Sequence, residues 1–333
     1  MAEAAGAPGA FSVSAVIPLF NKEGAIESTL RSVLAQTRAP DELIVVDDGS
    51  TDASLAIAEG VLASSAGTIT WRVISQDNAG EGAARNRGAA ESRCRYIALL
   101  DADDVWLPGH LAELERLAAI FPSATVISTR NARQNGSGVL LPAPSALGSE
   151  FFGPVERPIH AYRRGCGILN SSCVCIRRDA WERSGGFDVG AAGADVLLWL
   201  KLGLTETFAH SGRPLSIWRD EYSAVASRKT AIPRQLHHFL GTAEGLRHLD
   251  NADLVRFLAS NLVMQVAVYT LLGNRKIVAE FRRLAVALPP LARVQCWAAT
   301  LVPPTVYRSI AWWRKYRRER QRSGSILAAP GRD

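Results

Sequence analysis

The sequence predicts an α/β fold in which helices flank a mostly parallel sheet, with a helical region at the C-terminal end. Short apolar segments of strand length alternate with helical segments of about 10 to 15 residues in the first half of the chain. Such alternation is typical of parallel strands joined by right-handed crossovers. From about Pro233 onward the apolar residues recur at helical spacing, and no strand pattern remains.

Each expected element follows from a local pattern. Strands are expected where apolar residues alternate or form short runs, over 11–20, 42–46, 69–75, 96–100, 124–128, 168–177, 207–209 and 215–218. Helices are expected where apolar residues recur every three or four positions or follow a capping residue, in segments that begin near 26, 53, 80, 111, 179 and 195. Residues 131–158 are rich in Gly, Pro and Ser and are expected to form a mobile loop.

The length predicts more than one compact unit, because a chain of 333 residues exceeds the usual size of a single domain. We expect a flexible tail over 1–10, an α/β domain over 11–225, a helical region over 226–311 and a basic tail over 312–333. The composition, with 47% hydrophobic and 21% charged residues, excludes a chain that is disordered throughout.

The formal charge of +6 is concentrated near the C-terminal end, where residues 312–322 carry a dense cluster of Arg and Lys beside aromatic side chains. Two interpretations remain open: contact with an anionic membrane surface, or a solvated basic tail. The body of the chain is not basic enough to predict binding to nucleic acid. No apolar segment reaches the ~20 residues of a membrane-spanning helix, and the N-terminal residues lack a signal-peptide pattern, so we expect a cytoplasmic protein.

Three carboxylates, Asp101, Asp103 and Asp104, directly follow the strand expected at 96–100. Ligands of open α/β sheets bind beyond the carboxyl ends of the strands, so these acids are expected to face a site. Carboxylates this close repel one another unless a cation lies between them, and their hard oxygen atoms suit Mg²⁺ or Mn²⁺. The alternative is that one Asp caps the helix beginning near Pro108 and the others are solvated.

Two further polar segments end strands at the same edge. Residues 18–21, Pro-Leu-Phe-Asn, end the first strand, and residues 47–52, Asp-Asp-Gly-Ser-Thr-Asp, end the second. Because the carboxyl ends of parallel strands meet at one edge of a sheet, these segments and the acidic one are expected to hold a base, a ribose and a metal-bound diphosphate.

With these motifs the chain resembles the inverting glycosyltransferases of family 2. The resemblance covers roughly residues 13–218, and its motifs occur in order at 18–21, 32–37, 45–52, 78–80, 84–88, 101–104, 171–178, 185–188 and 194–202. It implies the GT-A fold, a Rossmann-like, mostly parallel sheet flanked by helices, here with a helical C-terminal extension. It also implies that residues 11–225 bind a nucleotide-diphosphate sugar and catalyse the transfer of its sugar.

The resemblance implies roles for individual residues. The nucleotide sugar would contact Pro18, Phe20, Asn21, Asp47, Asp48, Asn78, Arg85, Asp101 and Ala102. Asp103 would ligate the divalent cation, Mn²⁺ or Mg²⁺, and Arg85 would lie near the diphosphate. The acceptor side would include Ser171, Ser172, Gly186, Phe187 and Trp199.

Asp195 is the expected general base, because the segment 194–202 resembles the helix that carries it in the family. An acceptor hydroxyl must lose a proton as it attacks the anomeric carbon, and a carboxylate at a helix N-terminus is suited to accept it. The alternative is that Asp195 is only the N-cap of an apolar helix. Two departures from the family pattern are Ala194, where an acid is common, and the lack of a histidine at 218–223, which leaves Asp220 or Glu221 as candidates for a third metal ligand.

The predicted function is the transfer of a hexosyl or related group from a nucleotide-diphosphate sugar to a hydroxyl of a glycan or lipid-linked acceptor, as in polysaccharide or cell-envelope biosynthesis. A non-catalytic nucleotide-sugar-binding protein of the same fold is one alternative, which Ala194 favours. An NAD-dependent oxidoreductase is another, because residues 80–85 imitate a dinucleotide-binding fingerprint. Arg85 argues against it, since that fingerprint has a small residue there. Without a Gln-x-x-Arg-Trp segment, a single-addition transferase is expected and not a processive synthase.

Overall fold

The computed structural model describes residues 11–302 apart from residues 66, 68, 135–139, 190–192, 220–231 and 272. The chain forms two compact units, Met1–Gln235 and Leu236–Asp333. The boundary expected between residues 225 and 226 lies outside the described residues, as do the tails expected at 1–10 and 312–333.

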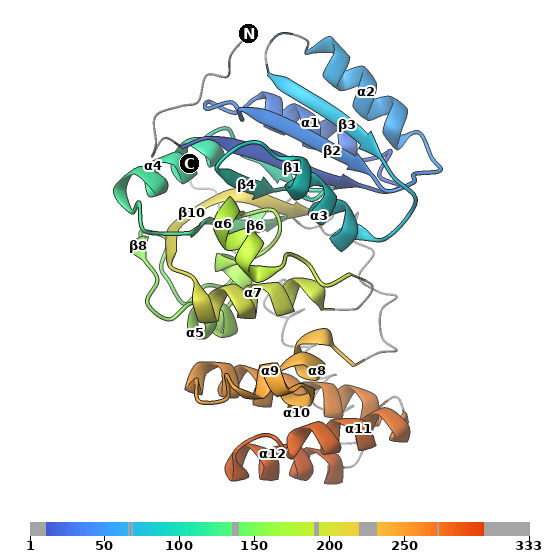
Figure 1. Cartoon of the computed structure of the whole chain (residues 1–333), viewed down its shortest axis with the longest axis vertical. Coiled ribbons are helices and arrows are strands. Elements are labelled where there is room, and N and C mark those ends of the chain that lie inside the picture. The colour runs from blue at the N-terminus through green and yellow to red at the C-terminus, as the bar shows by residue number, and fades with distance from the viewer. Residues whose placement is uncertain are drawn as a thin grey trace, which may run out of the picture. The chain divides into compact units, whose positions relative to one another are not determined.

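A ten-stranded sheet forms the centre of unit 1 (Figure 1). Its order is β3 (Thr70–Ser75), β2 (Glu42–Asp47), β1 (Val13–Leu19), β4 (Tyr96–Leu99), β9 (Val174–Arg177), β6 (Val126–Gln134), β10 (Phe208–Arg219) and β5 (Val105–Trp106), while β7 (Leu140–Pro142) pairs with β6 and β8 (Phe152–Pro154) with β10. Strand β9 runs antiparallel to both β4 and β6, so β1 to β4, β6 and β10 all point in one direction. The predicted mostly parallel sheet is confirmed.

Helices cover both faces of this sheet (Figure 1). One face carries α1 (Ile26–Leu34), α2 (Ser54–Ser64) and α4 (His110–Ile120), and the other carries α3 (Glu81–Glu91), α5 (Pro158–Arg164), α6 (Arg178–Ser184) and α7 (Ala194–Thr205). Successive side chains of a strand point to opposite faces, so Ala15 and Ile17 of β1 join the first core and Val16 joins the second. Strands buried on both faces explain the unbroken apolar runs of the sequence.

Helix α3 lies unusually close to the sheet, and Gly88 allows this approach. A Cβ atom on Gly88 would lie 2.3 Å from Cγ1 of Val16 and 3.3 Å from Cγ2 of Val46. The glycine therefore sets the height of α3 above β1 and β2, and with it the position of Arg85 one turn earlier on the same helix.

Three local predictions were wrong. The strand expected at 168–177 is shorter, because the 3-10 helix Cys166–Ile168 (η1) and a turn precede β9. The two short strands expected near 207–218 are one strand, β10, whose pairing with β6 shifts register between Ser211 and Ser216. Within the loop expected at 131–158, residues 131–134 continue β6, and β7 and β8 add edge pairings that a Gly- and Pro-rich composition does not indicate.

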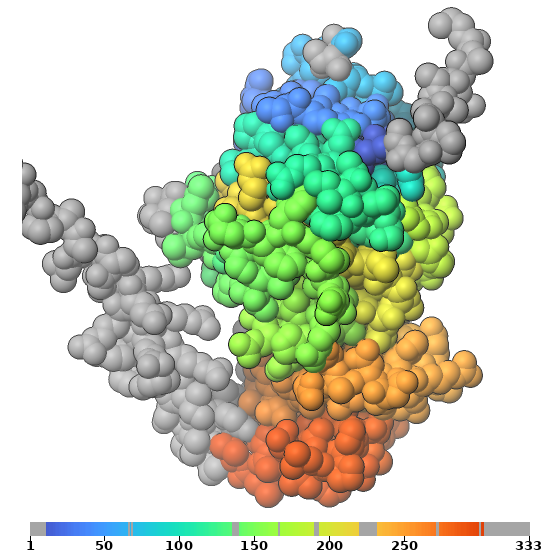
Figure 2. All heavy atoms as spheres, turned by 90° about the vertical axis from the view of Figure 1, so that its left-hand side faces the viewer, coloured from blue at the N-terminus to red at the C-terminus, as the bar shows by residue number. Residues whose placement is uncertain are grey.

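Unit 2 is helical throughout the residues that the structure describes, as predicted. It contains most of α8 (Arg234–Gly241) and then α9 (Ala243–Leu246), α10 (Ala252–Leu271), α11 (Arg275–Ala285) and α12 (Pro290–Leu301). Leu258, Leu262 and Phe281 are fully buried between these helices, which form the continuous orange-to-red body of Figure 2. The side chains of Thr242 and Asn274 cap α9 and α11 by accepting backbone N–H bonds.

The packing of α3 gives a stability prediction. Gly88→Ala should lower the free energy of unfolding by about 1–3 kcal/mol, because the new methyl group overlaps Val16 and α3 must move. Gly60→Ala on α2 is the matched control: nothing lies within 4 Å of its Cβ position, so it should stabilise by about 0.5–1 kcal/mol. Urea denaturation of both variants checks this, and equal effects of the two substitutions would contradict the packing argument.

Candidate functional site

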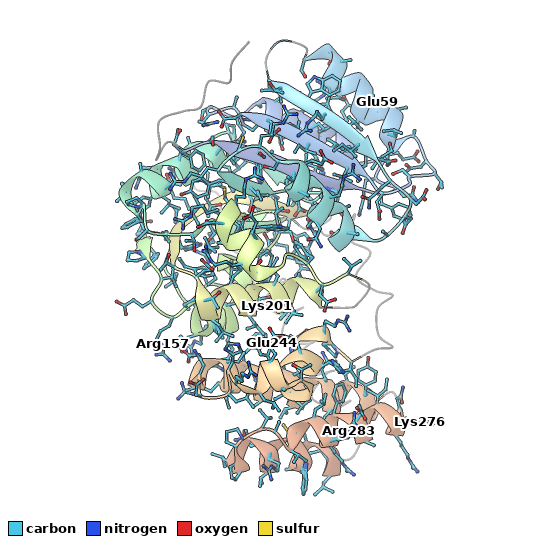
Figure 3. The ribbon with its side chains drawn as sticks, viewed as in Figure 1. Glu59, Arg157, Lys201, Glu244, Lys276 and Arg283 are labelled. Carbon is cyan, nitrogen blue, oxygen red and sulfur yellow. The ribbon has the colours of Figure 1, made fainter. Side chains whose placement is uncertain are left out.

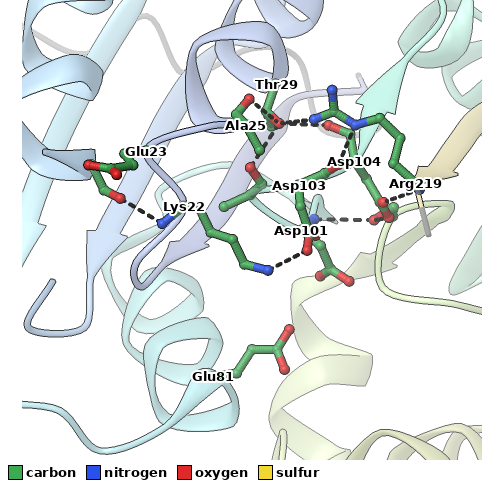
Figure 4. Close-up of polar contacts among 12 residues, drawn as sticks. Lys22, Glu23, Ala25, Thr29, Glu81, Asp101, Asp103, Asp104 and Arg219 are labelled. Atoms are coloured by element: carbon green, nitrogen blue, oxygen red, sulfur yellow. Dashed lines mark hydrogen bonds and ion pairs between the residues drawn. The ribbon is translucent and has the colours of Figure 1, made fainter. Parts of the chain in front are cut away.

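The acidic segment 101–104 lies where the sequence predicts, beyond the carboxyl end of β4 and beside the ends of β1 and β2. The N–H of Leu100 donates to the carbonyl of Val16, and that of Asp48 donates to the carbonyl of Leu19. These bonds bring the segments after β1, β2 and β4 to one edge of the sheet. Figure 4 shows Lys22 of the segment after β1 reaching toward the acidic segment after β4, with Glu81 and Arg219 nearby.

Asp103 forms an ion pair with Lys22, which lies in the segment after β1 (Figure 4). The Lys22 Nζ atom is 2.5 Å from a carboxylate oxygen of Asp103, and the two side chains are 24% and 14% exposed. The charge on Asp103 is therefore neutralised by a cation of the chain itself. The sequence motif contains Lys22 next to Asn21, but it gives no sign of this pairing.

Asp101 forms a second ion pair, with Arg85 of α3. The Arg85 Nη2 atom lies 2.6 Å from Asp101 and also contacts Glu81 one turn earlier on α3. The guanidinium group lies over the ring of Phe187, 4.9 Å from its centroid. Although burial opposes it, the charges of Asp101, Glu81 and Asp195 raise the pKa of Arg85. The buried arginine is thus a permanent positive charge among carboxylates.

Asp195 occupies the first turn of α7 and is exposed. The N-cap of this helix is Gly193, with φ +80°, and no side chain caps it. The alternative reading of Asp195 as an N-cap is therefore wrong. The charge of Asp195 contributes to the raised pKa of Arg85, so the two side chains lie within electrostatic range of each other, although Asp195 belongs to an element 94 positions beyond Asp101.

Asp104 is buried, in contrast to Asp101 and Asp103. Its two carboxylate oxygens accept hydrogen bonds from Ser172 Oγ, at 2.5 Å, and from the Arg219 N–H, at 3.1 Å. Burial, with the nearby negative charge of Asp101, raises the pKa of Asp104 well above its usual range. This residue therefore connects the acidic segment to the loop before β9 and the end of β10. The N-cap of α4 is Gly109, so none of the three aspartates caps that helix.

The carbonyl groups of the acidic segment are also held in place. Thr29 Oγ1 lies within hydrogen-bond distance of the carbonyls of Ala102 and Asp104, and Arg219 Nε donates to the carbonyl of Asp103. Arg219 further contacts Ser28 and Thr29 of α1. Backbone groups fixed on both sides leave the Asp101 and Asp103 carboxylates pointing into the site.

On the side of the site where the nucleoside is expected to bind, the Asp48 carboxylate accepts hydrogen bonds from the loop that follows β3. Its carboxylate accepts bonds from Gln76 Nε2 at 2.7 Å and from the N–H groups of Ala79 and Gly80 at 2.9 and 2.8 Å. This loop includes Asn78, which is exposed. Asp48 itself is buried, so it shapes this side of the site through the loop.

Of the other residues predicted to contact the nucleotide sugar, some are exposed and some are buried. Phe20 is 43% exposed, and Asn21, with φ +50°, accepts the Thr51 N–H through its side chain. Pro18, Asp47 and Ala102 are buried beneath them. Phe20 and Asn21 therefore present the accessible surface, and the buried residues support it.

On the expected acceptor side, Asn86 fixes the turn that carries Phe187. Its side chain accepts the Phe187 N–H and donates to the Phe187 carbonyl, both at 2.8 Å. Gly186 has φ +66°, and a Cβ there would lie 2.5 Å from Asn86 Oδ1. Trp199 is buried against Phe187, with ring centroids 6.0 Å apart, so it supports the turn from the core.

The two predicted serines lie next to each other but differ in contacts. Ser171 and Ser172 are both buried, and Ser172 Oγ also accepts the Asp101 N–H. The structure brings Arg85, Asp101, Phe187 and Ser172 into contact with one another, and Asp103 belongs to the same acidic segment; Asp195 is linked to them only through its electrostatic effect on Arg85. Sequence reasoning missed the roles of Lys22, Thr29, Glu81, Asn86, Asp104 and Arg219. The spacing of Glu81 and Arg85 on one helix is the clearest signal that was available for any of them.

The donor set suits a hard divalent cation only in part. In the described ranges, no group of three or more His, Cys, Asp or Glu side chains is arranged to hold a metal ion. Asp101 and Asp103 offer carboxylate oxygens, which matches Mg²⁺-type sites that use one or two carboxylates and take further ligands from substrate phosphates. Asp220 and Glu221, the candidates for a third ligand, lie outside the described residues.

Part of the chain is similar in sequence to known proteins. The chain is 36% identical over 115 residues to the uncharacterized glycosyltransferase alr2836 of Nostoc sp., which covers 34% of each protein. It is 39% identical over 103 residues to the succinoglycan biosynthesis protein ExoU of Rhizobium meliloti, covering 31% of this chain and 29% of ExoU. The matched segments therefore span about a third of the length of these relatives.

Similarity to solved structures covers more of the chain than the sequence matches do. S. aureus TarS 1-349, solved in complex with UDP-GlcNAc, superposes with a TM-score of 0.64 at 19% identity, covering 91% of this chain and 92% of that one. This similarity supports the GT-A fold. The family model for glycosyl transferase family 2 matches residues 14–185, just over half of the chain, and includes the segments after β1, β2 and β4. The chain belongs to glycosyl transferase family 2.

Proposed function

We propose that the chain transfers a sugar from a nucleotide-diphosphate sugar to a hydroxyl group of a glycan or lipid-linked acceptor, with inversion at the anomeric carbon. The observation that carries this proposal is the pair of ion pairs, Arg85–Asp101 and Lys22–Asp103, beyond the carboxyl ends of the parallel strands, with Asp195 within electrostatic range of Arg85. A carboxylate base opposite a cationic donor site is the arrangement that such a transfer needs.

Asp195 is the general base of the proposed reaction. It is exposed, so an acceptor hydroxyl can reach it, and it lies in the first turn of α7. The acceptor oxygen attacks the anomeric carbon from the face opposite the leaving group, and Asp195 takes its proton. Attack from that face inverts the anomeric configuration.

The donor half of the site binds the nucleotide and its diphosphate. Exposed Phe20 and Asn21 contact the nucleoside, and Asp48 positions the Asn78 loop beside it. Arg85 and Lys22 direct positive charge toward the diphosphate. A divalent cation held by Asp103, with Asp101 nearby, would supply further positive charge to the departing diphosphate.

The alternative is a nucleotide-sugar-binding protein that lacks catalysis. Ala194 is the observation that favours it, because this position often holds an acid in related enzymes. Helix α7 nevertheless presents an exposed carboxylate one residue later, and its charge contributes to the raised pKa of Arg85. This placement favours the enzyme.

The acceptor proposal is linked to a membrane surface. None of the helices in the described ranges is long and apolar enough to cross a bilayer. On α12, Leu291, Val294, Trp297 and Leu301 are 73, 62, 49 and 79% exposed, and exposed Lys276 and Arg283 of α11 add positive charge to the same unit (Figure 3). Exposed apolar residues next to basic ones suit an anionic membrane, where a lipid-linked acceptor would lie. The similarity to a succinoglycan biosynthesis protein supports a glycan acceptor.

The base assignment gives a kinetic prediction. Asp195→Asn and Asp195→Ala should each lower the turnover number by about 10²- to 10⁴-fold, because the acceptor proton loses its base, while the affinity for the nucleotide sugar stays within about twofold. Release of the nucleoside diphosphate measures turnover, and calorimetry measures binding. Glu59→Gln on α2, an exposed residue in Figure 3, is the control with the same charge change. A turnover number for Asp195→Ala within threefold of the wild type would refute the assignment.

The membrane proposal predicts an effect of truncation. Removal of the residues after Pro304, with the basic cluster 312–322, should release the protein from vesicles that contain phosphatidylglycerol, since each basic side chain near the surface contributes about 1 kcal/mol. Vesicle co-sedimentation checks this, with phosphatidylcholine vesicles as the control. Equal binding of the full-length and truncated proteins to anionic vesicles would sink the idea.

A further inference from the structure

We infer that Lys22 competes with the divalent cation for Asp103, so that the cation and the donor diphosphate bind cooperatively. This inference rests on the proposed function. The Lys22 ammonium contacts a carboxylate oxygen of Asp103 at a distance of 2.5 Å. When a diphosphate arrives, its oxygens offer Lys22 another acceptor and free Asp103 for the cation.

The backbone of Lys22 is fixed, which makes the contact with Asp103 specific. Its N–H donates to Ser54 Oγ at 2.6 Å, and its carbonyl accepts the N–H groups of Ala25 and Ile26, each at 2.9 Å. The side chain therefore extends from an anchored point between β1 and α1 into the site (Figure 4). Only its methylene stem has to move for the ammonium to change partners.

Asp103 is equally constrained at its backbone. Its carbonyl accepts Arg219 Nε, and the neighbouring carbonyls of Ala102 and Asp104 contact Thr29. The side chain is 14% exposed, so its attraction to Lys22 is screened less than that of a fully exposed pair. A cation that arrives alone must break this contact before it gains Asp103 as a ligand.

The Arg85–Asp101 pair explains why we assign the exchange of partners to Lys22 and not to Arg85. The Arg85 guanidinium is 5% exposed, contacts both Asp101 and Glu81, and lies over the Phe187 ring. A planar group held on several sides is a fixed part of the site. Lys22 is more exposed and reaches Asp103 through one rotatable ammonium.

A binding linkage follows from this exchange. If the diphosphate removes Lys22 from Asp103, it raises the affinity of the site for the cation, and the cation must raise the affinity for the diphosphate by the same factor. The pair therefore keeps the site from filling with cation in the absence of donor. Lys22 is a positioning residue in this account, because it acts through Asp103.

The test is the binding of Mn²⁺ alone, measured by the electron paramagnetic resonance signal of free Mn²⁺. Lys22→Met should bind Mn²⁺ about five- to tenfold more tightly than the wild type, because Asp103 no longer has a competing cation. Addition of UDP should tighten Mn²⁺ binding of both proteins, because both gain phosphate ligands, but it should tighten that of the wild type about five- to tenfold more, because only there does the diphosphate also remove Lys22 from Asp103. Lys276→Met, with the same charge change on exposed α11 of unit 2, should match the wild type.

The double variant Lys22→Met, Asp103→Asn should lose the added Mn²⁺ affinity, which assigns the gain to Asp103. Unchanged or weaker Mn²⁺ binding by Lys22→Met would overturn the inference, since a lysine that merely orders Asp103 gives that result. The readout does not depend on sugar transfer. If Lys22→Met does not bind Mn²⁺ more tightly, the proposed role of Asp195 as the general base is unaffected. Conversely, the competition between Lys22 and Mn²⁺ can be measured whether or not the protein transfers a sugar.

Discussion

The site depends on how the chain balances the repulsion among Asp101, Asp103 and Asp104. Three carboxyl groups in four consecutive residues cannot all remain charged and close together without compensation. Each carboxyl group is stabilised in a different way. Asp101 forms an ion pair with buried Arg85, Asp103 forms one with Lys22, and buried Asp104 accepts hydrogen bonds from Ser172 Oγ and the Arg219 N–H. The segment is thereby held at the edge of the sheet with two carboxylates facing the site.

This balance connects elements that are far apart in the sequence. Lys22 comes from the end of β1, Arg85 from α3, Ser172 from the segment before β9 and Arg219 from the end of β10. Gly88 sets the height of α3, and Asn86 on the same helix fixes the Phe187 turn beneath Arg85. A change at any of these positions is therefore transmitted to the acidic segment through packed contacts. These side-chain contacts, more than the strands alone, position the acidic segment.

The sequence predicted the fold well where local pattern and burial agree. The apolar runs at 42–46 and 96–100 are strands because parallel strands are buried on both faces, and the polar residues after them mark the functional edge. The prediction failed for two edge pairings that composition does not reveal. Strand β8 pairs with β10 more than 50 positions away, and β7 pairs with the nearby end of β6 although both lie in a Gly- and Pro-rich segment.

The same distinction applies to the site. Asp101, Asp103 and Asp195 were predicted from motifs; the structure pairs Asp101 with Arg85 and Asp103 with Lys22, and the charge of Asp195 contributes to the raised pKa of Arg85. The roles of Lys22, Asp104 and Arg219 could not be predicted, because each depends on a partner more than 60 positions away. Trp199 was expected on the acceptor side but lies in the core, since an apolar helix gives no sign of which aromatic residue faces inward.

We propose that the edge beyond β1, β2 and β4 binds a nucleotide-diphosphate sugar and activates it for transfer. The release of nucleoside diphosphate from a panel of nucleotide sugars, with Mn²⁺ and with a chelator in its place, tests this. We expect turnover of at least one donor, which requires the divalent cation and is lost when Asp103 is replaced by Ala. Binding of NAD in preference to every nucleotide sugar, with no donor turned over under either condition, would contradict it.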